Sequence, residues 1–137
     1  IGESKINKLI VPKKNDSLLS VYDGKNITEN SNAKIKLWKG TTVEFLSADE
    51  YSVAVCDIDG VKITIILRDG EIPQKFLTGD ILICDDIPEN INFKKIIVSG
   101  ESDSENSIST EVYGDMDIKI KKNNYKIIIR EGNRCLN

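Results

Sequence analysis

The sequence predicts an all-β protein, either an antiparallel β-sandwich or a small β-barrel (OB-like or SH3-like) with an added C-terminal hairpin. Apolar residues recur at every second position in many segments, and no stretch of about 11 residues carries a helical stripe. Turn-forming residues separate these segments at a spacing of about 8 to 12 residues, which is typical of such folds. We therefore expect about ten short strands in a single all-β domain over residues 1–137.

Residues 1–39 are predicted to form basic N-terminal strands. Strand candidates in this part of the chain and just beyond it are short apolar segments between polar residues. These segments are Lys8–Val11, Leu18–Tyr22, Lys34–Trp38 and Thr42–Leu46. Trp38 ends an apolar strand, and we interpret this lone tryptophan as packing at the core or the rim of the domain.

Residues 40–99 are predicted to form a β-meander core. Its strongest signal is a hairpin from Tyr51 to Leu67, in which Asp59-Gly60 supplies the positive φ angles of a tight turn. Asp85-Asp86 and Pro88 end a later strand, because proline lacks a ladder donor. The reversals and strands that follow the hairpin are Arg68-Asp69-Gly70, a turn at Thr78-Gly79-Asp80, a strand at Ile81–Cys84 and a strand at Phe93–Val98.

The remaining chain predicts a flexible loop at 100–110 and a C-terminal hairpin within 111–131. The loop is rich in Gly, Ser, Glu, Asp and Asn, whereas Met116 to Arg130 alternates apolar and charged residues around an Asn123-Asn124 turn. We expect the core to contain Val53, Val55, Ile63, Ile65, Leu67, Ile81, Ile83, Ile96, Val98, Ile127 and Ile129.

The absence of histidine excludes most familiar enzyme sites. Histidine is the usual general base near neutral pH and the partner in Ser-His and Cys-His nucleophile pairs, and none of the 137 residues is histidine. The three cysteines are too far apart in sequence for a short metal-binding motif. We therefore expect no catalytic residues, no cofactor and no metal.

The sequence constrains localisation only weakly. No apolar run approaches the length of a membrane span, and the first residues do not resemble a signal peptide. The chain opens at Ile1 without a methionine, which is compatible with removal of a leader or an upstream domain. Cys56 and Cys84 lie in apolar runs and indicate buried reduced thiols, whereas Cys135 lies in a polar tail. A reducing, cytoplasmic compartment fits this pattern better than secretion.

Several acidic groups are weaker candidates for chemistry. The Asp57-x-Asp59-Gly60 string lacks the remaining ligands of a calcium loop, and we interpret it as a turn. Asp85-Asp86 with Glu89 is interpreted in the same way. A carboxylate-based hydrolase needs a pair of acids, and no pair stands out among its candidates. These candidates are Glu44, Glu50, Glu71 and Asp80.

Charge is unevenly distributed along the chain. Residues 1–39 carry eight lysines against four acidic residues, whereas residues 40–92 carry three basic against eleven acidic residues. Residues 112–137 are again basic, with six basic and three acidic residues. Such asymmetry favours a complementary partner or self-association.

The C-terminal hairpin holds the best candidate surface for a partner or a nucleic acid. Its basic and aromatic residues are Lys119, Lys121, Lys122, Tyr125, Lys126 and Arg130. An overall formal charge of −3 counts against a dedicated nucleic-acid binder. We therefore expect a non-enzymatic interaction protein that binds another protein or assembles with itself, and that does not act at a membrane. A small accessory, inhibitor or assembly factor of a low-GC bacterium, phage or virus fits this expectation. A single-stranded nucleic-acid-binding module and a carboxylate-based hydrolase are the alternatives.

Overall fold

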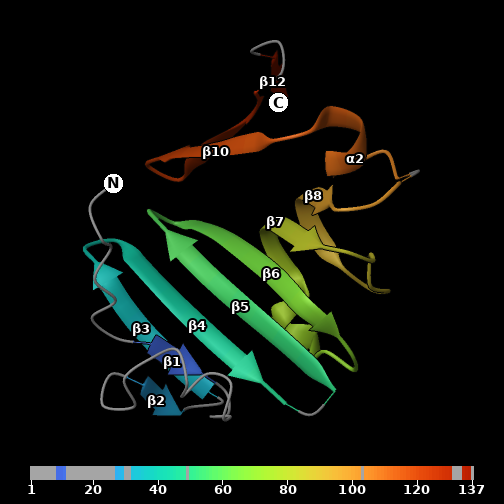
Figure 1. Cartoon of the computed structure of the whole chain (residues 1–137). Coiled ribbons are helices and arrows are strands. Elements are labelled where there is room, and N and C mark those ends of the chain that lie inside the picture. The colour runs from blue at the N-terminus through green and yellow to red at the C-terminus, as the bar shows by residue number, and fades with distance from the viewer. Residues whose placement is uncertain are drawn as a thin grey trace, which may run out of the picture.

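A computed structural model describes residues 9–11, 27–29, 32–48, 50–102, 104–130 and 134–136. The part of the chain that the structure describes is nearly all β, as predicted. The predicted antiparallel sandwich or barrel is wrong, because the main sheet has seven strands of mixed direction arranged as a β-solenoid. Figure 1 shows this sheet and a second, smaller sheet lying across one end of it.

The first half of the main sheet is antiparallel and follows the predicted pattern. Its strands are β3 (Asn32–Trp38), β4 (Thr41–Ser47), β5 (Tyr51–Ile58) and β6 (Val61–Asp69), and each pairs with the next. Asp59 and Gly60 have φ angles of 49° and 83°, so the predicted Asp-Gly hairpin is confirmed. The strand candidates at Lys34–Trp38 and Thr42–Leu46 are confirmed as β3 and β4.

The second half of the main sheet is parallel, so the predicted β-meander of 40–99 holds only as far as β6. The further strands are β7 (Thr78–Cys84), β8 (Asn92–Val98) and β9 (Ser107–Ser109). A short 3₁₀ helix, η2 (Gln74–Phe76), precedes β7, and a four-residue helix, α2 (Thr110–Tyr113), follows β9. The predicted turn at Thr78-Gly79-Asp80 is therefore wrong, because these residues begin β7, and the predicted loop at 100–110 contains β9.

The parallel strands stack identical residues in a row. Ile65 pairs with Ile83, Ile83 with Ile97, and Ile97 with Ile108. We call the side of the sheet that carries this row the outer face and the opposite side the inner face. Ile81 and Leu82 are adjacent in β7 and both are fully buried, so this part of the sheet is covered on both faces, as parallel sheets are.

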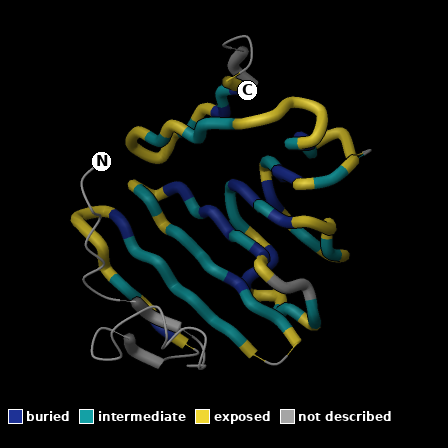
Figure 2. The backbone as a smooth tube through the Cα atoms, in the orientation of Figure 1, coloured by how far each residue is buried: buried dark blue, intermediate teal, exposed yellow. Residues whose placement is uncertain are grey.

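Two hydrophobic clusters cover these faces. The segment that connects β6 to β7 supplies Leu77 to the inner cluster, which also contains Phe93 of β8 and Ile66, Leu82 and Ile96. The outer cluster combines residues of β6 to β9 with Ile127 of the C-terminal hairpin. Figure 2 shows the buried residues concentrated in the parallel strands, whereas β4 is mostly half-buried.

The C-terminal hairpin belongs to a second sheet with three strands. These are β10 (Met116–Lys121), β11 (Asn124–Ile129) and β12 (Arg134–Leu136), all antiparallel. The hairpin from Met116 to Arg130 is confirmed, but its turn is Lys122-Asn123, with φ angles of 46° and 59°, and not Asn123-Asn124. A two-stranded parallel pair, β1 (Leu9–Val11) and β2 (Ile27–Glu29), precedes the main sheet. The candidate at Lys8–Val11 is confirmed as β1, and the candidate at Leu18–Tyr22 lies outside the described residues.

Three hairpin turns are joined through their backbones. The Asp59 N–H donates to the Gly40 carbonyl at 2.7 Å, and the Asn123 N–H donates to the Asp59 carbonyl at 2.9 Å. A Cβ atom on Gly60 would lie 1.8 Å from the Asn123 Oδ1 atom, so only glycine allows this approach. These contacts fix the tip of the β10–β11 hairpin against the turn between β5 and β6.

The predicted core is largely confirmed. Seven of its members are buried, namely Val53, Ile63, Ile81, Ile96, Val98, Ile127 and Ile129. Val55, Ile65 and Ile83 are half-buried. The prediction that Leu67 belongs to the core is wrong, because 60% of its surface is exposed. Val53 pairs with Ile66 and Ser52 with Arg68, so a bulge leaves Leu67 as the extra residue and places Ile66 in the core.

We predict that Ile127→Ala lowers the free energy of unfolding by about 2 to 5 kcal/mol, because it empties a fully buried site between the two sheets. Ile65→Ala has a smaller effect, since this side chain is only half-buried. Denaturant titration measures both variants. A wild-type unfolding midpoint for Ile127→Ala would show that the hairpin does not cover the outer face.

Candidate functional site

The β10–β11 hairpin presents one face to the core and one to solvent. Ile118, Ile120, Tyr125 and Ile127 belong to the outer hydrophobic cluster. Because side chains alternate along a strand, Lys119, Lys121 and Lys126 point away from that cluster, and all three are exposed. We call these three residues the lysine face.

Two lysines of this face lie directly opposite each other. Lys119 of β10 pairs with Lys126 of β11, and Lys121 pairs with Asn124. Like charges in directly opposed positions of an antiparallel pair destabilise it. Among the described residues, the salt bridges are formed by Lys94 and Arg130, and none involves the lysine face. No salt bridge therefore neutralises the lysine face in this part of the protein, although the nearby Asp117 carboxylate attracts Lys119.

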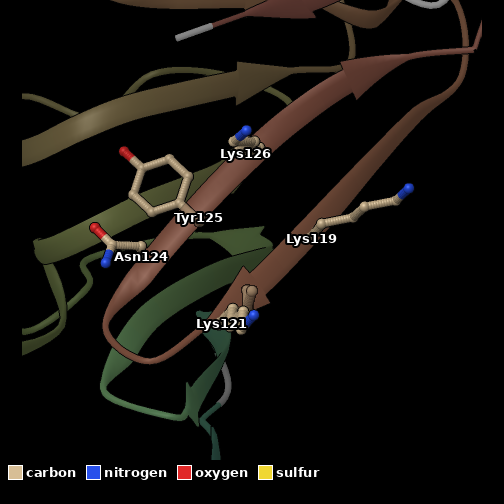
Figure 3. A pocket seen from close by; sticks show the side chains of 6 residues that line it. Lys119, Lys121, Asn124, Tyr125 and Lys126 are labelled. Carbon is tan, nitrogen blue, oxygen red and sulfur yellow. The ribbon is translucent and has the colours of Figure 1, made fainter.

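A hollow of about 520 Å³ lies at this end of the hairpin. It is lined by Lys119, Ile120, Lys121, Asn124, Tyr125 and Lys126. Figure 3 shows that the lining side chains come from both strands of the hairpin, with Asn124 and Tyr125 pointing to one side and Lys119 to the other. The hollow combines cationic groups with the apolar surface of Ile120 and the ring of Tyr125.

Tyr125 is half-buried, and its environment explains its pKa. Burial raises the pKa of its phenol, the Asp80 carboxylate raises it further, and the Lys94 ammonium group opposes this shift. The side chain packs against the outer hydrophobic cluster. One side of its ring is therefore committed to packing, which leaves less of it for stacking on a base.

Asp80 is a structural anchor beside this hollow. Its carboxylate accepts a hydrogen bond from the Lys94 ammonium group at 2.6 Å and another from the Lys62 backbone N–H at 2.9 Å. Burial alone would raise the pKa of Asp80, but these hydrogen bonds and the charges of both lysines bring it below its usual value. The carboxylate of Asp80, one of the candidate hydrolase residues, therefore already accepts two hydrogen bonds within the protein.

The other residues of the predicted basic surface have different environments. Arg130 donates to the Asp117 carboxylate at 3.0 Å and lies 3.9 Å from Asp115, so its charge is compensated. Hydrogen bonding to Asp117 raises the pKa of Arg130. Lys122 is exposed and sits in the turn itself, with a φ angle of 46°.

The acidic candidates lie on different elements and form no metal-holding group in the described residues. Glu44 lies on β4, whereas Glu50 and Glu71 are exposed in connecting segments. No group of three or more Asp, Glu or Cys side chains in the described part is positioned to hold a metal ion. Asp57 instead accepts a hydrogen bond from the Gly60 N–H at 3.2 Å, and Asp85 accepts one from the Ser99 hydroxyl at 2.5 Å.

Both described cysteines are free thiols within strands. Cys84 is buried, and burial together with Asp85 and Asp86 raises its pKa to about 11. Burial also raises the pKa of the half-buried Cys56. Both thiols therefore ionise less readily than a free cysteine, and Cys84 packs as a small apolar side chain in the inner cluster. The predicted exposure of the Cys135 side chain lies outside the described part.

No protein family, curated protein or solved structure matches this chain. Its own geometry therefore carries the functional argument. In the described residues, no helix has the length and apolar character needed to cross a membrane.

The sequence identified the basic residues of the hairpin but not their pairing. The predicted Asn123-Asn124 turn would have opposed Lys119 to Ile128, whereas the observed turn opposes Lys119 to Lys126. A shift of the turn by one residue changes every cross-strand pair. The docking of Asn123 against Asp59 selects the observed turn, and no local sequence signal reports this contact.

We predict that Asp80→Asn destabilises the protein at neutral pH and has less effect in acid. The pKa of Asp80 is lowered by folding, so its carboxylate stabilises the fold above about pH 4 and this contribution is lost as the pH falls through the lowered pKa. Denaturant titrations of wild type and variant at pH 7 and near pH 3 measure the difference. An equal difference at both pH values would contradict this assignment.

Proposed function

We propose that this protein is a non-enzymatic interaction protein that binds an acidic segment of a protein through the lysine face. The observation that carries the proposal is the direct opposition of Lys119 and Lys126, with no ion-pair partner for either in the described residues. Keeping two like charges opposite each other costs stability in the free protein. A carboxylate placed between them relieves this repulsion and gains two charge-assisted hydrogen bonds.

The hollow supplies the rest of the binding energy. Exposed ion pairs contribute only about 0.2 to 1 kcal/mol each, so lysines alone would bind a partner weakly. The apolar surface of Ile120 and Tyr125 lines the same hollow and adds burial of an apolar group of the partner. An acidic segment with a neighbouring apolar side chain fits this combination.

A protein partner is favoured over single-stranded nucleic acid. Nucleic-acid binding on a β surface relies on exposed aromatic rings, and Tyr125 is half-buried against the core. The net formal charge of −3 also repels a polyanion at a distance. Carboxylates on a folded or extended protein need only the local charge of the lysine face.

Self-association is a second candidate, because the chain also carries an acidic edge. We use this name for Asp85, Asp86, Glu101 and Glu111, which follow the carboxyl ends of β7, β8 and β9 and are exposed. These strands are parallel, so their carboxyl ends lie at the same side of the sheet. No lysine or arginine occurs from Ile96 to Ile118. A second copy is thus one source of acidic groups for the lysine face.

We predict that the double variant Lys119→Glu/Lys126→Glu binds a short labelled peptide, with glutamates on both sides of one leucine, at least about tenfold more weakly than wild type, because it replaces attraction by repulsion at two contacts. Fluorescence anisotropy at low ionic strength measures the affinity. Lys75→Glu is the control, since it removes an exposed lysine that lies in η2, away from the hairpin in sequence. Equal affinities for the double variant and this control would sink the proposal.

The same assay distinguishes the nucleic-acid alternative. We expect no measurable binding of a mixed-sequence oligonucleotide at physiological salt. Micromolar or tighter binding that is abolished by neutralising Lys119, Lys121 and Lys122 together would instead show that the hairpin binds single strands. A further loss with Tyr125→Ala would show that a base stacks on that ring.

For self-association we predict an apparent mass that falls as salt rises to about 0.5 M, because contacts between exposed charges are screened. Sedimentation equilibrium over a salt series measures this mass. A monomer at every ionic strength would exclude a second copy as the partner of the lysine face and leave a different protein.

A further inference from the structure

Within the described residues, the main sheet has one long edge strand with no further strand paired to its outer side. β3 is its first strand, with seven residues, and within the described residues it pairs only with β4. The opposite edge is β9, which has three residues and leads directly into α2. Open edges invite pairing with other chains, and proteins commonly shorten or cover them. β9 follows this practice, and β3 does not.

The end of β3 exposes two large apolar side chains. Leu37 is 50% exposed and Trp38 is 62% exposed, although the sequence predicted core or rim packing for Trp38. Between Lys36 and Trp38 the pairing with β4 shifts by a bulge, which leaves Leu37 without a cross-strand partner. Exposed tryptophan at the edge of a sheet is costly to leave in water and is enriched at interfaces.

Lysines alternate along the same strand. Lys34 and Lys36 are exposed on one face of β3, and the exposed Lys39 follows in the turn to β4. Within the described residues none of the three forms a salt bridge. The edge formed by β3 therefore combines a strand on which a further strand can pair, the positive charge of three lysines, and two exposed apolar side chains at its end.

We propose that β3 is a docking edge to which an extended acidic segment of another protein adds as a further strand. The backbone of that segment would hydrogen-bond to β3, as in other cases of strand addition. Acidic side chains opposite Lys34 and Lys36 form cross-strand ion pairs, and an apolar side chain covers Leu37 and Trp38.

Charge selects this occupant over a second copy. Antiparallel pairing of two β3 strands would bring Lys34 and Lys36 of both copies onto one face, where like charges oppose each other. An acidic strand meets the same lysines with favourable charge. The docking edge lies on a different sheet from the lysine face, although the turn after β3 and the tip of the hairpin both bond to Asp59. The test below therefore follows Trp38, at the end of β3, so that its failure is distinguishable from failure of the proposed function.

The protein offers its own probe for this site, because Trp38 is its only tryptophan. A synthetic peptide in which glutamate and valine alternate serves as the acidic strand and contains no fluorophore. We expect its addition to shift the Trp38 emission to shorter wavelength. The same peptide N-methylated at every residue has no N–H group to donate to β3 from either edge and should give no shift.

Two charge variants locate the binding surface. Lys34→Glu should weaken peptide binding, as read by the Trp38 emission, about fivefold, whereas Lys75→Glu, with the same change in net charge, should leave it unchanged. An equal effect of the two variants on the Trp38 shift would overturn the proposal. So would an equal shift with the N-methylated peptide, the absence of any shift, or a shift that depends on protein concentration without peptide, which would indicate a second copy.

Discussion

The packing of the β10–β11 hairpin on the outer face of the parallel strands determines both the burial of that face and the orientation of the lysine face. The row from Ile65 to Ile108 would be exposed without a cover, and Ile127 with its neighbours provides one. Because these residues use the sheet-facing side of the hairpin, alternation directs Lys119 and Lys126 outward. The backbone bond from Asn123 to Asp59 then fixes which lysines oppose each other. The docking of the hairpin on the sheet thus produces both the outer hydrophobic cluster and the outward arrangement of the lysines.

The sequence predicted the antiparallel half of the fold well and missed the parallel half. The Asp59-Gly60 turn has a local chemical signature, which joins β5 to β6 without ambiguity. Strands β7 and β8 are covered on both faces and are joined by short connections with no long helix, so they look like hairpin strands in sequence. The run from Ile81 to Cys84 lacks polar alternation, which is the signal of a parallel strand that the prediction did not use.

The sequence predicted which residues form the candidate site, but not how these residues are arranged across the strands. Lysines around an aromatic residue in a hairpin indicate a binding surface, but the role of each depends on contacts across strands. Arg130 is compensated by Asp117 on the neighbouring strand, and Tyr125 is half-buried beside Asp80. The open edge at β3 was equally hidden, because the sequence does not show which strand ends a sheet.

The central claim is that Lys119 and Lys126 repel each other in the free protein and are retained for a partner. The most direct measurement is the free energy of unfolding of Lys126→Glu at low salt, compared with wild type. Replacing repulsion by attraction should raise it by about 0.2 to 1 kcal/mol, and this gain should shrink at high salt. An unchanged or lower stability at low salt would show that the pair is not strained, and would contradict the claim.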